Sequence, residues 1–217
     1  MTVHLERPLL IVGAGAGAEE VADLAGQIEG VEIAGFVEGL DRERCAAGLL
    51  GLPVHWVDDL APLAETHCAV GAVGSTRRAG FIGRVEEQGL PFATLVHPSA
   101  EVAPSATLGP GTVVGVRAVI ASHTRIGRHV YVNRGALIGH HDTIGDFVTI
   151  APGANIAGKC TIGERVYVGM GSTVVDHTVV GERSVIGAGA VVVRDVPPRV
   201  QVVGVPARVV RTEVDGL

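Results

Sequence analysis

The chain has 217 residues, 47% of them hydrophobic and only 3% aromatic, and its formal net charge is −6. The length allows two modest domains, and the negative charge argues against a general nucleic-acid-binding surface. No apolar run is long enough for a membrane span and the first residues lack the layout of a signal peptide, so we expect a cytoplasmic protein without membrane insertion.

Residues 1–95 alternate short apolar segments with segments of helical composition. The apolar segments, which are typical of strands, are 9–12, 31–37, 53–57, 69–73 and 92–96. The helical segments are 19–28 and 77–88. We interpret this part as a small βαβ domain of Rossmann-like topology. It has half the size of a full dinucleotide domain, so one nucleotide is a better expectation than NAD.

A turn rich in small residues joins the first strand to the first helix. It contains Gly13, Gly15, Ala16 and Gly17, and the second strand ends at Glu38. This order of strand, glycine turn, helix, strand and acid predicts a nucleotide site with phosphate at the helix N-terminus. The alternative is that the glycines only let the helix pack closely on the strand, and that Glu38 is a solvated strand end.

From residue 96 onward an aliphatic residue recurs at every sixth position. The series is Val96, Val102, Leu108, Val114, Ile120, Ile126, Val132, Ile138, Ile144, Ile150, Ile156, Ile162, Val168, Val174, Val180, Ile186 and Val192. A period of six fits neither a helix nor a simple strand. It is the hexapeptide repeat of a parallel β-helix, which we expect over 96–196. Residues 197–217 leave the repeat and are expected to cap the open end of the coil.

Residues eighteen positions apart stack on the same edge of such a coil. One column contains Ser105, His123, His141, Lys159, His177 and Asp195. In the neighbouring column His140 lies directly beneath Gly158, which leaves space above the imidazole. Histidines therefore gather along one edge, where a groove for chemistry is expected.

The sequence His140-His141-Asp142 is the densest polar cluster inside the repeat. An imidazole can remove a proton near neutral pH, and a nearby carboxylate would orient it and raise its basicity. Asp142 occupies a position that elsewhere holds small or β-branched residues, so we expect it to be partly buried. The alternative is that the histidines are merely solvated and that Asp142 bonds to backbone amides.

Two further hypotheses concern the turns of the coil. Asn133 stands where Gly or Ala is usual, and the tolerance of Asn for left-handed backbone geometry would explain it without any function. A zinc site would need three converging imidazoles, which His123, His129 and His141 would have to supply. No ligand spacing in the sequence supports such a site, so no metal is expected.

Several motifs, in this order along nearly the whole chain, resemble one family. They are Gly13-Ala14-Gly15-Ala16-Gly17, Phe92-Ala93-Thr94-Leu95-Val96-His97-Pro98-Ser99-Ala100, Asn133 with His140, Ile150-Ala151-Pro152-Gly153-Ala154 and Val203-Gly204-Val205-Pro206-Ala207-Arg208. The chain is similar to bacterial sugar acetyltransferases related to sialic acid O-acetyltransferase and to the bacillosamine-pathway and perosamine N-acetyltransferases. The resemblance implies a left-handed β-helix, a homotrimer with active sites between subunits, acetyl-CoA as donor and a nucleotide-linked sugar as acceptor.

The resemblance also implies roles for particular residues. His140 matches the catalytic base and Asn133 a residue that lines the acceptor site. The residues that match positions near acetyl-CoA are Thr149, Gly158 and Met170. Those that match the contact region for the sugar nucleotide are Gly15, Ala16, Gly17 and Glu38.

This chain also departs from the family's pattern. The position after the base, often acidic in the family, is His141, so either His141 or Asp142 is the expected partner of His140. Thr149 stands where some members place a histidine near the thioester. Arg208 or Arg211 is a candidate for the coenzyme phosphates.

We therefore predict that His140 deprotonates a sugar amine or hydroxyl as it attacks the thioester, with a backbone amide near Gly158 stabilising the oxyanion. The product would enter cell-surface glycan biosynthesis. The alternatives are a β-helix acetyltransferase for a free sugar, sialic acid or an amino acid, a metal-dependent hydratase, and a non-catalytic sugar-nucleotide-binding scaffold.

Overall fold

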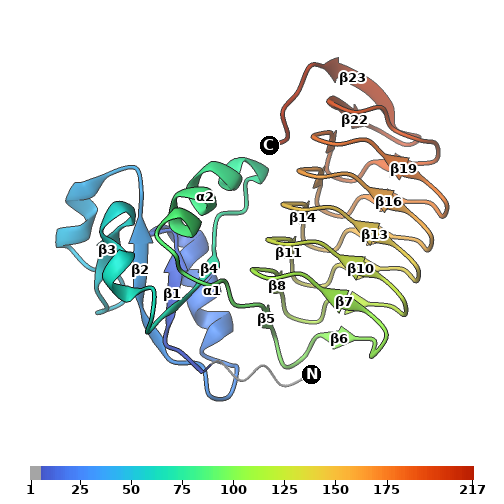
Figure 1. Ribbon diagram of the computed structural model, residues 1–217. Helices are drawn as coiled ribbons and strands as arrows, with labels where there is room; N and C mark the ends of the chain where they lie inside the picture. Colours follow the sequence, from blue (N-terminus) through green and yellow to red (C-terminus); the bar gives the residue numbers. More distant parts are fainter. Residues whose placement is uncertain (1–5) are drawn as a thin grey trace.

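The computed structural model describes residues 6–217, which form two parts of different architecture (Figure 1). The first part contains a four-stranded sheet in the order β3-β2-β1-β4, in which every strand pair is parallel. Its main elements are β1 (Leu9–Val12), α1 (Ala16–Ala25), β2 (Ile33–Glu38), β3 (Val54–Trp56), β4 (Cys68–Gly71) and α2 (Ala79–Glu87). Short 3-10 helices lie at Arg42–Ala46, Val57–Asp59, Ala61–Leu63 and Thr76–Arg78.

The alternation of side chains along β1 divides the core of this part in two. Leu9 and Ile11 pack with α1, whereas Leu10 and Val12 pack with Val85 of α2. The two helices therefore cover opposite faces of the sheet. The first helix begins three residues earlier than predicted, because the extended backbone of Gly15 serves as its N-cap.

The second part is a parallel β-helix built from three sheets. The three sheets are numbered in the order in which each turn of the β-helix passes through them. Five strands form the third sheet: β7 (Thr107–Leu108), β10 (Arg125–Ile126), β13 (Thr143–Ile144), β16 (Thr161–Ile162) and β19 (Val179–Val180). Six strands form the second sheet: β6 (Glu101–Val102), β9 (Val119–Ile120), β12 (Leu137–Ile138), β15 (Asn155–Ile156), β18 (Thr173–Val174) and β21 (Val191–Val192). The first sheet contains β5 (Leu95–Val96), β8 (Val113–Val114), β11 (Tyr131–Val132), β14 (Thr149–Ile150), β17 (Tyr167–Val168), β20 (Val185–Ile186), β22 (Val200–Val203) and β23 (Arg208–Thr212).

The repeat of the sequence matches the register of the coil. Strands of neighbouring coils pair eighteen residues apart, as in the pairs Ile126 with Ile144 and Val132 with Ile150. The aliphatic residue of each repeat points inward and belongs to one continuous core. The predicted parallel β-helix is thus confirmed, whereas its left-handed sense stays a prediction.

The glycines that follow the inward aliphatic residues allow neighbouring turns of the β-helix to approach closely. Gly139, which follows an inward aliphatic residue, has no room for a side chain, because a Cβ there would lie 2.5 Å from the backbone nitrogen of Gly158 in the next coil. Bulky residues adopt the left-handed conformation along the edges, among them His141 at φ 61° and Phe147 at φ 57°. Asn133 is not among the residues of positive φ, so backbone tolerance does not explain it.

The C-terminal residues, which were expected to cap the open end of the coil, form an antiparallel pair of strands. β22 continues the first sheet beyond β20, and β23 folds back along β22. No helix in residues 6–217 is long and apolar enough to span a membrane.

The two parts meet on the first sheet of the coil. Val113 and Tyr131, which point outward from β8 and β11, belong to the same core cluster as α1 and β1. In a three-sided coil, the edge opposite the first sheet is the one between the second and third sheets. That edge carries His123, His140, His141 and His177, and it is called the histidine edge below.

Candidate active site

His140 lies in the turn between β12 and β13, on the histidine edge. Its imidazole is exposed and faces Gly158 of the next coil. A Cβ at Gly158 would lie 2.7 Å from Nε2 of His140 and 2.8 Å from Cε1. The glycine therefore provides the space into which Nε2 points, as the stacking of residues eighteen apart predicts.

His141 holds the other nitrogen of the same imidazole. The Nδ1 atoms of His140 and His141 are 3.1 Å apart, and the two rings are nearly perpendicular, at 87°. One Nδ1 must donate a proton to the other in this contact. If His140 is the donor, its Nε2 keeps a free lone pair, which is the tautomer that a general base needs.

The surroundings of His141 favour the neutral ring that can accept this hydrogen bond. Desolvation lowers the pKa of His141, and positive charge from His123, His140, Lys159 and Arg125 lowers it further. The ring of His123 also lies close to His141, with centroids 4.8 Å apart. A neutral His141 can therefore accept from Nδ1 of His140 near neutral pH.

Asp142 does not orient His140, contrary to one of the two expected arrangements. Its side chain points into the coil and is fully buried, and Oδ1 accepts a hydrogen bond of 2.7 Å from the amide of Cys160. The buried Oδ2 has no hydrogen-bond partner within residues 6–217. Burial raises the pKa of Asp142 to about 6. The contact with His140 comes from His141 instead.

A second candidate site lies in the N-terminal part, at the carboxyl ends of β1, β2 and β4. It is a cavity of about 570 Å³. Among the residues that line it are Gly13, Ala14, Gly15, Gly17, Glu38, Leu40, Arg44, Gly74, Ser75, Arg77 and Arg78. The structure thus brings together the predicted glycine turn, which precedes the N-terminus of α1, and Glu38. Ligands of open parallel sheets bind at this end of the strands.

Gly17 fixes the distance between α1 and β4. A Cβ at Gly17 would lie 2.6 Å from the carbonyl oxygen of Ala72, whereas a Cβ at Gly15 would meet nothing within 4 Å. Ala16 is exposed in the first turn of α1. Close packing therefore requires a glycine at 17, as the alternative interpretation supposed, and Gly15 leaves the mouth of the cavity open.

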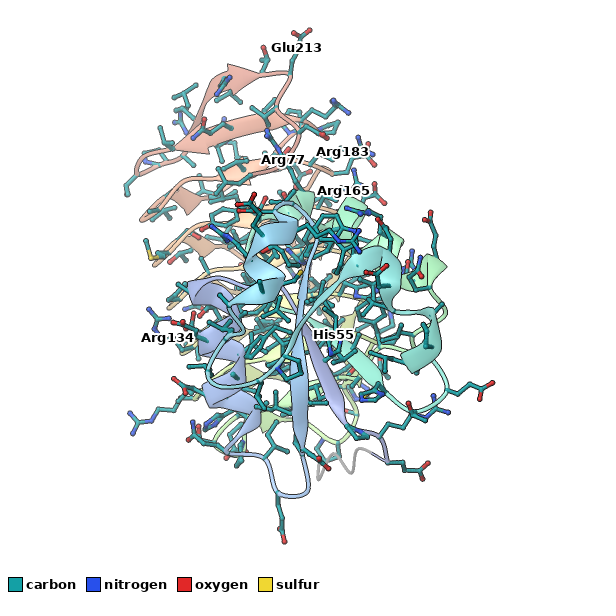
Figure 2. The ribbon with its side chains drawn as sticks, turned by 90° about the vertical axis from the view of Figure 1, so that its left-hand side faces the viewer. His55, Arg77, Arg134, Arg165, Arg183 and Glu213 are labelled. Atoms are coloured by element: carbon teal, nitrogen blue, oxygen red, sulfur yellow. The ribbon has the colours of Figure 1, made fainter. Side chains whose placement is uncertain are left out.

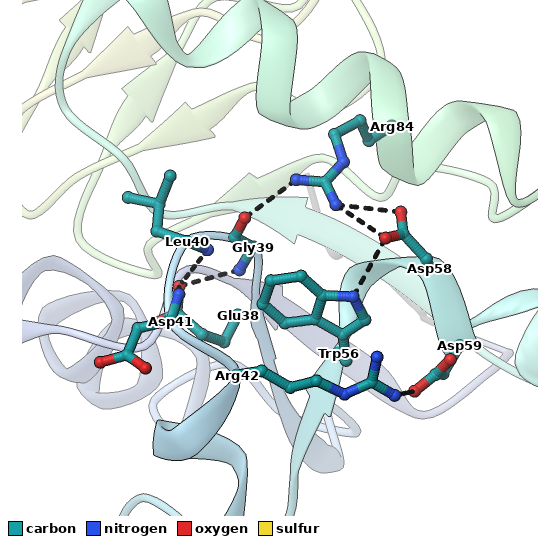
Figure 3. A network of polar contacts seen from close by, with 9 residues as sticks. All are labelled: Glu38, Gly39, Leu40, Asp41, Arg42, Trp56, Asp58, Asp59 and Arg84. Atoms are coloured by element: carbon teal, nitrogen blue, oxygen red, sulfur yellow. Dashed lines mark hydrogen bonds and ion pairs between the residues drawn. The ribbon is translucent and has the colours of Figure 1, made fainter.

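Glu38 holds the loop beside this cavity (Figure 3). Its Oε1 accepts hydrogen bonds from the amides of Gly39 and Leu40, both at 2.8 Å. Oε2 lies 3.7 Å from the guanidinium of Arg44. Glu38 is therefore a buried structural residue as well as a lining residue, and not a solvated strand end.

An aromatic residue and two arginines keep the same loop in place (Figure 3). Arg42 and Arg84 each lie 5.6 Å from the ring centre of Trp56. Arg84 donates to the carbonyl of Gly39 at 2.9 Å and to both oxygens of Asp58. The loop 38–42, which contributes Glu38 and Leu40 to the lining of the cavity, is thus held in place.

Asn133 lies at the edge between the first and second sheets, away from His140 of the same chain. Its Oδ1 accepts from the amide of Arg134, whose guanidinium pairs with Glu20 of α1 at 2.8 Å. A small cavity of about 140 Å³ separates Asn133 from α1. Met170 is exposed on the same edge, two coils further on, so it is not beside Gly158.

Thr149, which stands where some family members place a histidine near the thioester, contacts the N-terminal part of this chain instead. It is buried on β14, its hydroxyl donates to the carbonyl of Gly74 at 2.9 Å, and it accepts from Arg78 at 2.7 Å. Both contacts join it to the N-terminal part. No sequence motif singled out the segment 74–78, although a segment that follows a strand beside β1 of a parallel sheet belongs at the ligand-binding end.

The histidines do not form a metal centre in the described part of the chain. Residues 6–217 contain no group of three or more His, Cys, Asp or Glu side chains placed to hold a metal ion. His129 lies on a different edge from His123 and His141, between the rings of Phe92 and Phe147.

The sequence of the β-helix matches a known protein family. The family described as bacterial transferase hexapeptide (six repeats) matches residues 143–176 and 159–194. No curated protein sequence matches the chain.

Solved structures match almost the whole chain. A variant of perosamine N-acetyltransferase from Caulobacter crescentus, with a histidine replaced by asparagine and in complex with CoA and GDP-perosamine, is 30% identical, with a TM-score of 0.86 over 94% of this chain and 97% of that one. The acetyltransferase domain of PglB from Neisseria gonorrhoeae in complex with acetyl coenzyme A is 32% identical, with a TM-score of 0.86 over 94% and 99%. WeeI from Acinetobacter baumannii is 25% identical, with a TM-score of 0.86 over 94% and 100%.

These relatives share the repeat, the coil and the N-terminal part over nearly their full length, and the chain therefore belongs to the family of hexapeptide-repeat sugar acetyltransferases.

Proposed function

We propose that this protein transfers the acetyl group of acetyl-CoA to an amine or hydroxyl of a nucleotide-linked sugar, with His140 as general base, in cell-surface glycan biosynthesis. The observation that carries the proposal is the imidazole of His140, held at Nδ1 by His141 and free at Nε2 beneath Gly158. The relatives complexed with CoA and GDP-perosamine and with acetyl coenzyme A support both substrate classes.

The chemistry requires little beyond alignment and proton removal, because a thioester is already activated. The amine nitrogen or hydroxyl oxygen of the sugar forms a bond to the thioester carbonyl carbon, and Nε2 of His140 takes the proton that this nitrogen or oxygen loses. The tetrahedral intermediate collapses, the carbon–sulfur bond breaks, and the leaving sulfur takes the proton from Nε2. No covalent enzyme intermediate is needed.

The coil also offers a donor for the developing oxyanion. In the turn above His140, the amide of Lys159 donates to the carbonyl of His140 at 2.8 Å, and the amide of Cys160 donates to Asp142. The amide of Gly158 stands outside this ladder of hydrogen bonds. We assign it to the carbonyl oxygen of the thioester, where a fixed donor stabilises the charge that forms.

The coenzyme would extend along the histidine edge toward the C-terminal end of the coil. Arg194 stands three coils beyond His140, or about 14 Å at the usual spacing of ~4.8 Å between strands. It lines a cavity of about 210 Å³ together with Arg208. We assign the coenzyme phosphates to these two arginines. Arg211 lines a different cavity.

The acceptor would bind in the N-terminal cavity, with its phosphates near the N-terminus of α1. This cavity belongs to the part that packs on the first sheet, whereas His140 lies on the opposite edge of the same chain. One chain therefore does not bring the two sites together. We propose that a neighbouring chain supplies His140, in a homotrimer with active sites between subunits. Cytoplasmic localisation also stays a prediction.

The first test is the release of free thiol from acetyl-CoA in the presence of UDP-, GDP-, dTDP- and CMP-linked sugars with free amines or hydroxyls. We expect turnover with one acceptor, its loss in His140→Ala, and its retention in His177→Ala, which removes another exposed histidine of the same edge. Full turnover in His140→Ala would refute the assignment of the base. Turnover only with a free sugar would refute the acceptor class.

The shared site is tested by mixing two inactive variants. His140→Ala chains and Gly17→Ala chains, reassembled together, should regain activity because some sites then combine an intact His140 with an intact nucleotide cavity. No recovery in mixed trimers of proven composition would count against a site shared between chains.

A further inference from the structure

One rim of the cavity proposed for the nucleotide is held in place by contacts to the β-helix as well as by the N-terminal part. This rim is the segment 74–78, which joins β4 to α2 and contributes Gly74, Ser75, Arg77 and Arg78 to the lining. Its contacts to the β-helix include buried hydrogen bonds to two backbone carbonyls and one hydroxyl.

Arg78 inserts its guanidinium into the junction between the two parts and is 4% exposed. It donates to the carbonyls of His129 at 2.6 Å and Val148 at 3.0 Å, and to the hydroxyl of Thr149 at 2.7 Å. No carboxylate within residues 6–217 pairs with it, and burial lowers its pKa to about 10. A buried charge with only neutral partners is costly, so its position is strongly determined by these acceptors.

Thr149 ties the other end of the rim to the same strand. Its hydroxyl accepts from Arg78 and donates to the carbonyl of Gly74 at 2.9 Å. The equivalent positions of the neighbouring coils hold Val113, Tyr131, Tyr167 and Val185. A small hydroxyl is therefore present in the coil that faces the rim and is replaced by larger or apolar residues above and below it.

Residues near the C-terminal end hold the middle of the rim. The amide of Thr76 donates to the carbonyl of Leu217 and the amide of Leu217 donates to the hydroxyl of Thr76, both at 2.9 Å. Figure 1 shows this end of the chain beside the segment that leads into α2. In Figure 2, Arg77 of the rim lies in the same region as Arg165 and Arg183 of the coil. The amide of Gly216 donates to the carbonyl of Arg183 at 2.8 Å.

We infer that Thr149 and Arg78 are positioning residues for the acceptor: the acetyl-transfer coil itself sets the shape of the nucleotide cavity through these contacts. The inference rests on the proposed function for the identity of the ligand. Loss of the Thr149 hydroxyl would release Gly74 and Arg78 together and loosen the rim. The sugar nucleotide would then bind more weakly, whereas acetyl-CoA, which is assigned to the histidine edge, would not be affected.

The test compares Thr149→Val, Thr149→Ser and Thr161→Val in the full chain. Valine keeps the β-branched shape, serine keeps the hydroxyl, and Thr161 is an exposed strand residue that serves as the matched control. We expect KM for the sugar nucleotide to rise about tenfold in Thr149→Val, which is ~1.4 kcal/mol, with KM for acetyl-CoA within twofold of wild type. Thr149→Ser should restore most of the affinity.

Two measurements do not depend on turnover. Hydrogen exchange of the amides of residues 74–78 should be faster in Thr149→Val than in Thr161→Val, and unchanged exchange would overturn the anchoring. Calorimetric titration with GDP, UDP, dTDP and CMP, the nucleotide portions of the four acceptor classes, should show weaker binding of the preferred nucleotide to Thr149→Val. Equal binding, or an equal loss of acetyl-CoA affinity, would overturn the positioning role. A wild type that binds none of the four would instead refute the proposed function.

Discussion

The space between His140 and Gly158 gives a direct test of the active-site geometry. Gly158→Ala would place a methyl carbon 2.7 Å from Nε2 of His140, whereas ordinary van der Waals contact begins at 3.4 Å. The ring must therefore withdraw by about 0.7 Å or rotate away. Rotation would break the Nδ1 contact with His141, and both movements would take Nε2 away from the acceptor.

The expected loss can be estimated from this displacement. A misplacement of about 1 Å at a reacting group costs roughly 10²-fold in rate, or ~2.7 kcal/mol of transition-state stabilisation. Stability should change little, because His140 is exposed and can move without disturbing the core. Gly83→Ala is the matched control, since a Cβ at that position of α2 meets nothing within 4 Å.

The assay is steady-state thiol release for wild type, Gly158→Ala, His140→Ala and the double variant. We expect kcat to fall about 100-fold in Gly158→Ala, and the methyl group to have no further effect once the imidazole is absent. A wild-type kcat in Gly158→Ala would refute the geometry. An equal loss in the His140→Ala background would show that the methyl group acts on coenzyme binding rather than on the imidazole.

Three other predictions concern the neighbours of these groups. His141→Asn, whose Oδ1 takes the place of Nδ1, should keep far more of the wild-type kcat than His141→Ala. In wild type, kcat/KM should fall as the pH drops below the lowered pKa of His141, because a protonated His141 cannot accept a hydrogen bond from His140. Because burial raises the pKa of Asp142 to about 6, this carboxyl group ionises in the unfolded chain first as the pH rises from about 4 to about 6. The contribution of Asp142 to the free energy of unfolding should therefore fall by up to about 3 kcal/mol across this window and stay level above it. Thermal unfolding of Asp142→Asn should show no such fall. Gly17→Ala, which meets the carbonyl of Ala72 at 2.6 Å, should lower the unfolding free energy by about 1–3 kcal/mol and abolish nucleotide binding in a calorimetric titration. Gly15→Ala, whose Cβ would meet nothing within 4 Å, should keep the unfolding free energy of wild type.

The coil could be predicted from the sequence because one physical requirement repeats in it without interruption. Each inward position, such as Ile138 or Ile150, must fill the same narrow interior, so the pattern survives at every sixth residue. The left-handed turn residues carry no such constraint on side-chain type. Phe147 and Arg165 occupy them although neither residue type favours positive φ, because the regular ladder above and below determines the backbone there.

The site was predictable only where it depends on stacking along the coil. His140 beneath Gly158 follows from the spacing of eighteen residues, whereas the sequence left the partner of His140 open between His141 and Asp142. The inward direction of Asp142 also followed from its place in the repeat, but its catalytic role did not. Contacts between distant segments, such as Thr149 with Gly74, depend on how the two parts dock, and no periodicity in the sequence encodes that.

The pairing of His140 with a second imidazole has a consequence that a carboxylate partner would not have. A carboxylate stabilises the protonated base and raises its pKa, so the base is stronger but is protonated over a wider pH range. A neutral His141 orients the ring without adding negative charge, and the nearby Lys159 and Arg125 disfavour a second positive charge. This arrangement makes the orientation of the His140 ring the property that His141 controls.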